Sequence, residues 1–240
     1  MRIATWNIPY SFRTNSHGDA WEYLLEEVPA DYYLVQEVNP PEWVYDECEV
    51  IWSEIGGTRN WGSGIISQNH SLREISIDTE FGGAIMAAES DFSPDLEMTL
   101  ISFYGLFEDI GGTNYTMPNL HRMLSDLTGL LEGKTHGNRN IALGGDLNAS
   151  VQFDTQYNID THRIFFERLE AFGLTDCFES FYEDYIQTYR DPRSDVDWQM
   201  DYLFVSDWLD AHLMQCEVVD NEKVRNLSDH NPVVATLETE

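Results

Sequence analysis

Residues 141–150 read "IALGGDLNAS", an apolar run that ends on two glycines and leads into Asp146 and Asn148. An apolar run bounded by glycine predicts a buried β-strand over residues 140–146. Side chains two positions apart on an extended segment lie on one side, so a carboxylate and an amide are expected to face a common space. The glycines would permit unusual backbone angles or the close approach of a ligand. Taken alone, however, Gly, Asp and Asn are ordinary turn formers, and this stretch by itself favours a turn.

Similar short apolar runs alternate with helical patterns along the chain. The predicted strands cover residues 2–8, 32–38, 62–67, 82–89, 98–105, 140–146, 201–206 and 232–238. No internal repeat, low-complexity tract or linker interrupts this alternation. The pattern predicts a single α/β domain over residues 1–240, with helices packed outside sheets.

Three helices are predicted from apolar side chains at helical spacing. Their stripes are Trp21, Leu24, Leu25 and Val28; Leu120, Met123, Leu124, Leu127 and Leu131; and Ile164, Phe165, Leu169 and Phe172. Asp19 is expected to cap the first helix, and Gly133 and Gly173 to end the second and the third. All three stripes are interpreted as core.

Composition favours a packed domain. The chain has 240 residues, of which 42% are hydrophobic and 13% aromatic, enough to bury a sizeable core. Cys48, Cys177 and Cys216 are too few and too widely spaced for a zinc pattern or a disulfide framework. The opening "MRIATWNIPY" is not a signal peptide, and no apolar run is long enough to span a membrane. We therefore expect a cytoplasmic monomer with reduced thiols.

The charge of the chain is unusual. Its formal net charge is -30, from 43 acids and 13 bases, and its only lysines are Lys134 and Lys223. Nucleic-acid binders usually gain affinity through clustered Lys and Arg, whereas this surface repels phosphate backbones at ordinary ionic strength. Two explanations remain open. The substrate is small, or the protein works in concentrated salt, where the screening length falls to roughly 3 Å near 1 M.

Polar residues that an interior rarely contains stand at the ends of the predicted strands. They are Asn7, Glu37, Tyr104, Asp146, Asn148, Asp201, Asp229 and His230. Each one alone has an ordinary explanation as a cap, a turn or a surface residue. Several at strand ends together predict groups that converge on one pocket.

Five motifs strengthen this prediction. "TWNI", "LVQEV", "GGDLN", "MDYLFVS" and "LSDHNPVV" occur in this order between Thr5 and Val234. Together they resemble the endonuclease/exonuclease/phosphatase superfamily, which includes AP endonucleases, DNase I-like nucleases, sphingomyelinases and inositol polyphosphate 5-phosphatases. The resemblance implies a DNase I-like four-layer α/β sandwich, in which helices flank two facing mixed β-sheets. It also implies hydrolysis of phosphate esters with a divalent metal, usually Mg²⁺ with Mn²⁺ as the alternative.

The resemblance implies a metal site built from three of these residues. Glu37 would be the principal ligand, with Asn7 beside it and Asp229 near the ion. Hard oxygen ligands are what magnesium prefers, and one or two carboxylates plus waters suffice. AP endonuclease-like members carry an acid two residues after the asparagine of the first motif, where this chain has Pro9. One ion is therefore favoured over two.

The resemblance also implies the catalytic roles. Asp146 would orient or deprotonate the attacking water, while Asn148 would hold the phosphate or a metal-bound water. Asp201 would fix the tautomer of His230, whose imidazole would meet a phosphate oxygen. Tyr104 matches a tyrosine that some members place against the phosphate or leaving group.

Two positions before the "DY" strand are less certain matches. Trp198 corresponds to an aromatic residue of AP endonucleases and is a weak candidate for substrate binding, although a packing role explains it equally well. Gln199 stands where those members often have arginine. The loop "GLFEDIGGTNYTMPN" that follows Tyr104 has no counterpart that we can assign.

The sequence leaves the substrate open. The first hypothesis is a metal-dependent phosphodiesterase that acts on nucleic acid, and the second is a phosphoesterase for a small phosphorylated metabolite or lipid headgroup. The acidic balance favours the second. A non-catalytic binding module is the third, but every core motif position is filled, which argues against it. Arginines at the pocket rim would favour nucleic acid; the candidates are Arg59, Arg122, Arg139, Arg163, Arg190 and Arg193.

Overall fold

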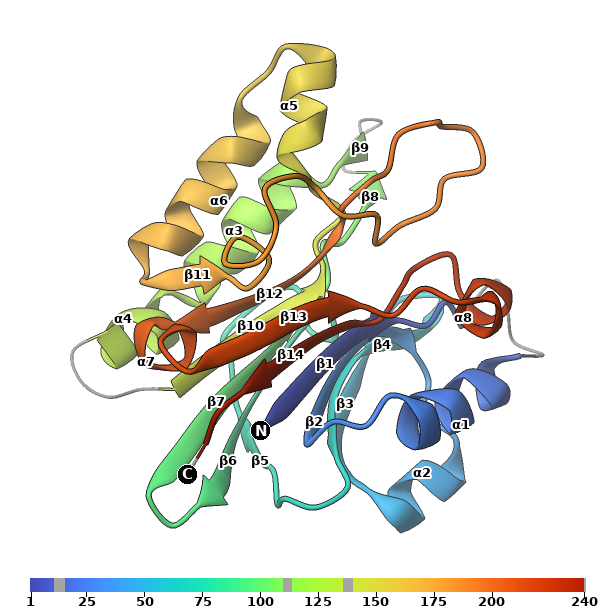
Figure 1. Ribbon diagram of the computed structural model, residues 1–240, viewed down its shortest axis with the longest axis vertical. Coiled ribbons are helices and arrows are strands. Elements are labelled where there is room, and N and C mark those ends of the chain that lie inside the picture. The colour runs from blue at the N-terminus through green and yellow to red at the C-terminus, as the bar shows by residue number, and fades with distance from the viewer. Residues whose placement is uncertain (11–15, 110–113, 136–139, 240) are drawn as a thin grey trace.

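Two six-stranded β-sheets pack face to face in the computed structural model, and helices lie outside them (Figure 1). The structure describes residues 1–10, 16–109, 114–135 and 140–239. The architecture is the α/β sandwich that the motifs imply. A small hairpin of β8 (Glu108–Asp109) and β9 (Asn114–Tyr115) is separate from both sheets.

The first sheet, sheet A, joins the two ends of the chain. Its strands in spatial order are β13 (Leu213–Val218), β14 (Val233–Leu237), β1 (Arg2–Asn7), β2 (Tyr32–Val38), β4 (Arg59–Ser67) and β3 (Glu49–Gly56). β1 runs parallel to β2 and antiparallel to β14. The carboxyl ends of β1 and β2 therefore meet the beginning of β14 at one edge of the sheet.

The second sheet, sheet B, brings together another pair of strand ends. Its order is β11 (Leu174–Asp176), β12 (Asp201–Ser206), β10 (Asn140–Asp146), β7 (Leu96–Phe103), β6 (Ile85–Ser93) and β5 (Arg73–Ile75). β10 is antiparallel to β12, and Asp146 lies directly opposite Asp201 in their register. The end of β10 thus meets the start of β12.

Helices cover the outer face of each sheet (Figure 1). On the side of sheet A lie α1 (His17–Glu27), α2 (Glu42–Glu47) and α8 (Glu222–Leu227). On the side of sheet B lie α3 (Met117–Asp126), α4 (Thr128–Thr135) and α6 (Thr161–Ala171), while α5 (Val151–Tyr157) stands at the end of the sandwich next to α6 and the short α7 (Asp207–Asp210) follows β12.

Three buried clusters hold the layers together. Leu34, Leu100 and Leu203 belong to the cluster between the sheets. Trp6 and Trp21 belong to the cluster under α1, and a third cluster joins sheet B to α3 and α6. Full burial of one such side chain contributes roughly 1.5–3 kcal/mol, so these layers supply the main stabilising free energy.

Two helix predictions were wrong in detail. The apolar stripe that ends at Leu131 spans two helices, because the chain turns at Leu127 between α3 and α4, and Gly133 lies inside α4. Leu127 and Leu131 are both buried, so the apolar periodicity continues across the turn and does not reveal it. Asp19 lies in the first turn of α1, which begins at His17 after Ser16. Gly173 ends α6 as predicted, with a φ of +75°.

Three strands have the predicted bounds, the longer β4 and β6 are offset by three or four residues at one or both ends, and the omissions are edge strands. β2, β10 and β12 have the predicted bounds, whereas β7 ends at Phe103 and leaves Tyr104 just beyond it. β3 and β13 form the two edges of sheet A and keep most residues partly exposed. An edge strand needs no continuous apolar run, so these two gave no signal.

Other sequence expectations concern the chain as a whole. All three cysteines are free, with Cys177 and Cys216 buried and Cys48 half-buried. Within the described ranges, no helix has both the length and the apolar character needed to cross a membrane. The loop over residues 105–119 lies partly outside the described residues, because positions 110–113 are not among them.

Candidate active site

The polar residues at the strand ends gather at one end of the sandwich. Asn7 closes β1, and Glu37 is the penultimate residue of β2. Asp146 closes β10 opposite Asp201 at the start of β12, while His230 precedes β14. Direct side-chain contacts join the two sheets here, since the Asn7 amide reaches both Glu37 of sheet A and Asp146 of sheet B.

A backbone irregularity directs Glu37 into the site. The pairing of β2 with β4 shifts register between Val35 and Val38, and Glu37 has a φ of +56°, in the left-handed region. Bulges of this kind re-aim a side chain, and the left-handed conformation costs a non-glycine residue roughly 1–3 kcal/mol. The Glu37 carboxylate accepts hydrogen bonds from Asn7 Nδ2 at 3.2 Å and from the Tyr104 hydroxyl at 2.9 Å.

Asp146 is held by three donors at the end of β10. Its Oδ1 accepts a hydrogen bond from the Asn148 backbone N–H at 2.9 Å. Its Oδ2 accepts from Asn148 Nδ2 at 3.1 Å and from Asn7 Nδ2 at 2.9 Å. Asn148 has a φ of +47°, so it meets Asp146 through a tight turn and not through the strand alternation that we expected. The turn that this stretch of sequence favours is therefore part of the site.

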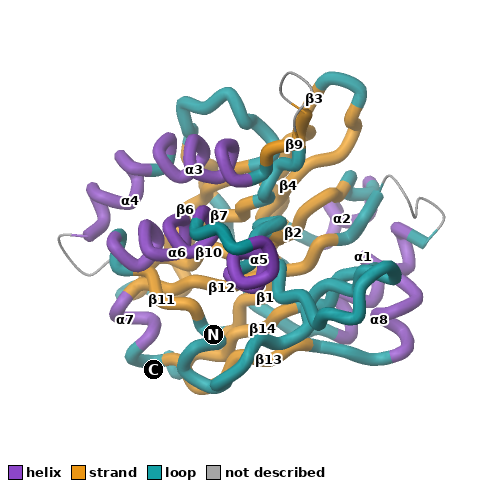
Figure 2. The backbone as a smooth tube through the Cα atoms, turned by 90° about the horizontal axis from the view of Figure 1, so that it is seen from above, coloured by secondary structure: helices purple, strands orange, loops and turns teal. Residues whose placement is uncertain are grey.

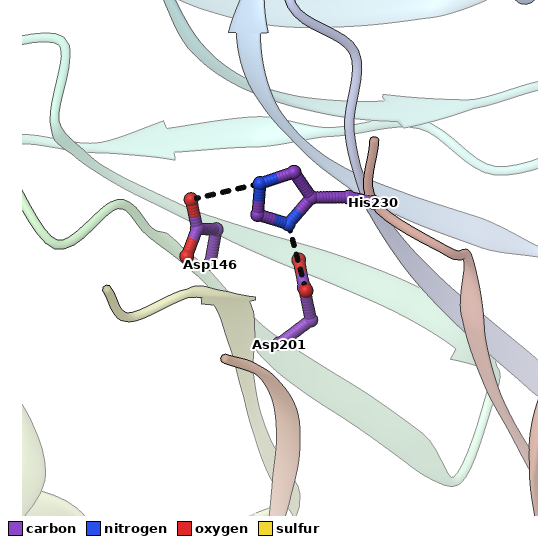
Figure 3. Close-up of side chains that lie close together, drawn as sticks. All are labelled: Asp146, Asp201 and His230. Atoms are coloured by element: carbon purple, nitrogen blue, oxygen red, sulfur yellow. Dashed lines mark hydrogen bonds and ion pairs between the residues drawn. The ribbon is translucent and has the colours of Figure 1, made fainter. Parts of the chain in front are cut away.

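His230 lies between two buried carboxylates (Figure 3). Its Nδ1 is 2.8 Å from Asp201 Oδ2, which is the expected pairing, and its Nε2 is 3.8 Å from Asp146 Oδ2. Tyr189 packs its ring 4.7 Å from the imidazole, centroid to centroid, and Trp6 Nε1 donates to the His230 carbonyl at 3.0 Å. The imidazole is therefore fixed in plane and in position.

Burial and neighbouring charges shift the pKa values of these groups. Burial raises the pKa of Asp146 and that of Glu37, because a carboxylate loses its hydration there. Burial alone would lower the pKa of His230, but the charges of Asp201 and Asp146 outweigh it and raise that pKa. The imidazole is thus held as a cation next to Asp146.

Two further candidates, Asp229 and Trp198, differ in their surroundings. Asp229 adjoins His230 in sequence and is half-buried, and its charge adds to the effect of burial in raising the pKa of Glu37. Trp198 is only 5% exposed, and its indole nitrogen donates to Ser194 Oγ at 3.1 Å. The tryptophan is therefore a packed residue beside the site.

Two of the candidate arginines lie near the site. Arg190 bonds Asn231 and the Ser228 carbonyl, in the loop that carries His230. Burial raises the pKa of Tyr104, and the charge of nearby Arg59 partly opposes that shift. Three others pair with acids elsewhere, in the ion pairs Arg122–Glu80, Arg163–Asp160 and Arg193–Asp191. Arg139 lies outside the described residues.

Comparison with solved structures identifies the fold, although no family model and no curated protein sequence matches the chain. An AP endonuclease from Archaeoglobus fulgidus superposes with a TM-score of 0.76 at 18% identity, over 100% of both chains. The 3′-5′ exonuclease NExo from Neisseria meningitidis gives a TM-score of 0.75 at 19% identity, again over 100% of both chains. The chain therefore shares the fold of these two nucleases.

A third structure with this fold contains nucleic acid. It is the 3′ phosphatase NExo from Neisseria bound to a product DNA hairpin, with a TM-score of 0.74 and 18% identity over 100% of both chains. Identity at this level relates the folds alone. What the present chain does must therefore be argued from its own site.

The donor atoms of the site suit a hard divalent cation. The carbonyl Oδ1 of Asn7 is buried and has no hydrogen-bond partner among the described residues, although Asn7 Nδ2 is fully engaged. Such an orphaned oxygen beside the Glu37 carboxylate is the kind of ligand that Mg²⁺ takes. Residues Asn7 and Glu37 thus fit a metal ion.

A second group of possible ligands is less suitable for a metal. Asp146, Asp201 and His230 also have ligand atoms within 4.8 Å of one another. However, both imidazole nitrogens face carboxylates, and the two charges favour the protonated ring, which has no lone pair for a metal. The charges around this trio suit proton transfer, whereas the oxygen atoms of Asn7 and Glu37 suit a hard cation.

The structure gives the two glycines of β10 a different purpose from the one expected. A Cβ on Gly145 would lie 1.9 Å from the Phe103 carbonyl oxygen, and one on Gly144 would lie 2.4 Å from the Leu203 side chain. The space beside the glycines is filled by neighbouring strands, so they serve strand packing and not the approach of a phosphate.

Sequence reasoning missed the residues that hold the site from behind. Gln36 is fully buried, and its Oε1 accepts the Asp146 N–H at 3.3 Å. Thr188 Oγ1 accepts the Asp201 N–H at 3.0 Å, and Ser228 Oγ donates to the Asn7 carbonyl at 2.8 Å. Only Gln36, a polar residue inside an apolar strand, carried a signal that could have identified it.

Proposed function

We propose that this protein is a divalent-metal-dependent phosphodiester hydrolase acting on nucleic acid, as an endonuclease or an exonuclease. One observation carries the proposal. The Asn7 amide connects the oxygen donors at Glu37 with the Asp146–His230–Asp201 chain, so metal ligands and proton-transfer groups face one space. The solved neighbours with this fold are named as AP endonucleases and a DNA-bound phosphatase, which supports the same chemistry.

The proposed reaction divides among the residues of the site. A metal ion held by Glu37 and Asn7 would neutralise charge on the non-bridging phosphate oxygens. Asp146 accepts the proton of the attacking water, because its raised pKa makes it a better base than an ordinary carboxylate. His230 donates a hydrogen bond from Nε2 to a non-bridging phosphate oxygen and keeps its proton, while Asp201 stabilises the imidazolium through Nδ1. The P–O bond to the leaving group then breaks, and the departing oxygen takes its proton from solvent. Asn148 holds the Asp146 carboxylate in place, and Tyr104 holds the Glu37 carboxylate.

A small phosphorylated metabolite or lipid headgroup is the second candidate substrate. The net charge of -30 favours it, because such a surface repels a polyanion more strongly than it repels a small ester. The two Arg residues near the site, Arg59 and Arg190, favour the nucleic acid, although Arg190 also pairs with Asp220 at 3.7 Å.

A substrate panel tests the proposal. Plasmid DNA, abasic duplex, RNA, bis-p-nitrophenyl phosphate and inositol phosphates are incubated with Mg²⁺ or Mn²⁺, at low and at molar salt. Chelation with EDTA should abolish cleavage, and Asp146→Asn should lower turnover about 10²- to 10⁴-fold, because it removes the base.

Asp176→Asn is the matched control for Asp146→Asn. Asp176 also ends a strand of sheet B, and its Oδ1 also accepts the N–H two residues on, from Phe178 at 3.0 Å. Burial raises its pKa to about 7. Equal losses in both variants, or full activity in Asp146→Asn, would contradict the role given to Asp146. Cleavage of inositol phosphates alone would assign the second candidate.

A further inference from the structure

Helix α5 rises directly from the catalytic end of the sandwich. It begins at Val151, three residues after Asn148, and Ser150 Oγ caps it by accepting the Gln152 N–H. Figure 2 looks along the axis of this helix from above the site end. The first turn of α5 therefore lies close in sequence to the turn that holds Asp146.

Three aromatic rings form a stack along one side of α5, which we call the aromatic ladder: Trp198, Phe153 and Tyr157. Phe153 lies 4.3 Å from Trp198 with 24° between the rings, and 6.1 Å from Tyr157 with 17° between them. Trp198 is buried, whereas Tyr157 is 61% exposed. The ladder thus runs from the core to solvent and ends in an accessible ring.

Hydrogen bonds hold the ladder rigidly to the segments that carry the catalytic residues. Gln152 Nε2 donates to the Asp197 carbonyl at 2.9 Å, and Gln152 Oε1 accepts the Gln199 N–H at 3.0 Å. The Leu147 N–H in turn donates to the Met200 carbonyl at 2.9 Å. These hydrogen bonds connect the ladder to the turn after Asp146 and to the strand that begins at Asp201.

The helix that bears the ladder also lacks the acidity of the rest of the chain. Between Leu147 and Ile159 the only acidic residue is Asp154. Its carboxylate is buried and accepts the N–H groups of His162 and Arg163 at 3.2 and 2.7 Å. A polyanion that reaches the site along α5 would thus meet aromatic and amide side chains on a protein whose net charge is -30.

We propose that Tyr157 stacks on an unpaired nucleobase of a substrate strand that reaches the catalytic end of the sandwich along α5. The inference rests on the nucleic-acid function proposed above. Stacking is tolerant of base sequence, because every base has a π-face. Unlike a lysine contact with the backbone, it also survives high salt. An acidic protein can therefore gain affinity for a polynucleotide through this ring.

Binding of a fluorescently labelled single-stranded oligodeoxynucleotide tests the ladder. Tyr157→Ala and Tyr157→Phe are made in the Asp146→Asn background, so that the strand stays intact. We expect Tyr157→Ala to weaken binding about 10-fold, since stacking on one ring is worth roughly 1–3 kcal/mol. Tyr157→Phe should retain affinity, because the ring and not the hydroxyl makes the contact.

Tyr45→Ala is the matched control, because Tyr45 is a 50% exposed helical tyrosine on α2, over sheet A. It should bind as the parent does. The ratio of the Tyr157→Ala and parent dissociation constants should stay constant from dilute buffer to molar potassium chloride. A strand with 2-aminopurine should lose fluorescence on binding the parent and keep it on binding Tyr157→Ala.

A hydrolysis assay separates this inference from the proposed function. Hydrolysis of bis-p-nitrophenyl phosphate is measured with proteins in which Asp146 is intact. This ester has no nucleobase, so its hydrolysis reports on the catalytic centre by itself. If that ester and the oligonucleotide are both cleaved and Tyr157→Ala binds like Tyr45→Ala, the ladder inference is wrong while the function stands. If no ester is cleaved yet binding depends on Tyr157, the function fails and the ladder stands. Absence of oligonucleotide binding overturns the ladder.

Discussion

A single amide couples the two halves of the site. Asn7 Nδ2 donates to Glu37 at 3.2 Å and to Asp146 at 2.9 Å, which leaves its carbonyl oxygen free for a cation. Ordered motifs in the sequence were enough to expect these residues together. The left-handed backbone of Glu37 and the ring of Tyr189 against His230 were not predictable, because both depend on tertiary packing.

Asp201→Asn tests how the imidazole is held. Asp201 Oδ2 lies 2.8 Å from His230 Nδ1, and its charge raises the pKa of His230 against the opposing effect of burial. An asparagine removes that charge, so the pKa of His230 falls in the variant. We expect turnover to fall about 10- to 100-fold, as for other residues that orient a catalytic group.

The pH dependence gives the Asp201→Asn test its sign. The proposed reaction requires the protonated imidazole of His230, so the alkaline limb of the kcat–pH profile should report loss of this proton. Because the variant has the lower His230 pKa, its alkaline limb should move to lower pH. The profile is measured from acid to alkaline pH for both proteins with bis-p-nitrophenyl phosphate. An unmoved limb would mean that Asp201 has no electrostatic role in the reaction.

At the scale of elements, strand interiors were more predictable than helix ends. β2, β10 and β12 are continuous buried runs, which a hydrophobic pattern identifies directly. The break between α3 and α4 keeps the same apolar face buried, so the pattern carries no trace of it. The sequence also could not show why β10 needs its glycines, because the atoms that crowd them belong to strands distant in sequence.

Substitution of the glycines of β10 tests their packing role. Gly145→Ala brings a Cβ within 1.9 Å of the Phe103 carbonyl oxygen, at a φ of +155°. Because that contact is with backbone, we expect a loss of about 3 kcal/mol in the free energy of unfolding. Gly144→Ala should cost less, since the Leu203 side chain can move. Urea unfolding measures both.

Gly129→Ala is the control for the glycine series. Gly129 lies in α4 with no atom within 4 Å of a Cβ, and alanine in a helix is favoured by roughly 0.5–1 kcal/mol. This variant should be slightly more stable than the parent. If Gly145→Ala were as stable as Gly129→Ala, close strand packing would not explain the glycine.

At the scale of the whole molecule, carboxylates crowd one another. An open cavity of about 420 Å³ beside α6 has carboxylates on its wall, including Glu167, Glu170, Glu179 and Glu183. Burial raises the pKa of Glu179, and the charge of Glu170 raises it further. The composition alone predicted such repulsion, whereas the place where the acids meet required the fold.

The last prediction is that salt stabilises this protein. Like charges repel across a compact state of net charge -30, and added ions screen that repulsion. Melting temperature should therefore rise steadily from dilute buffer to molar potassium chloride. Glu170→Gln combined with Glu179→Gln removes two facing charges, so this variant should melt higher than the parent in dilute buffer and gain less from salt.

Plasmid nicking along the same salt series connects the surface to the site. An ordinary nuclease loses DNA affinity as salt rises, because its phosphate contacts depend on counterion release. A protein that relies on a metal, short hydrogen bonds and aromatic stacking should keep its nicking activity where its melting temperature is highest. If the melting temperature fell with added salt, screening would not be the benefit of this surface, and the excess of carboxylates would need a cause other than adaptation to salt.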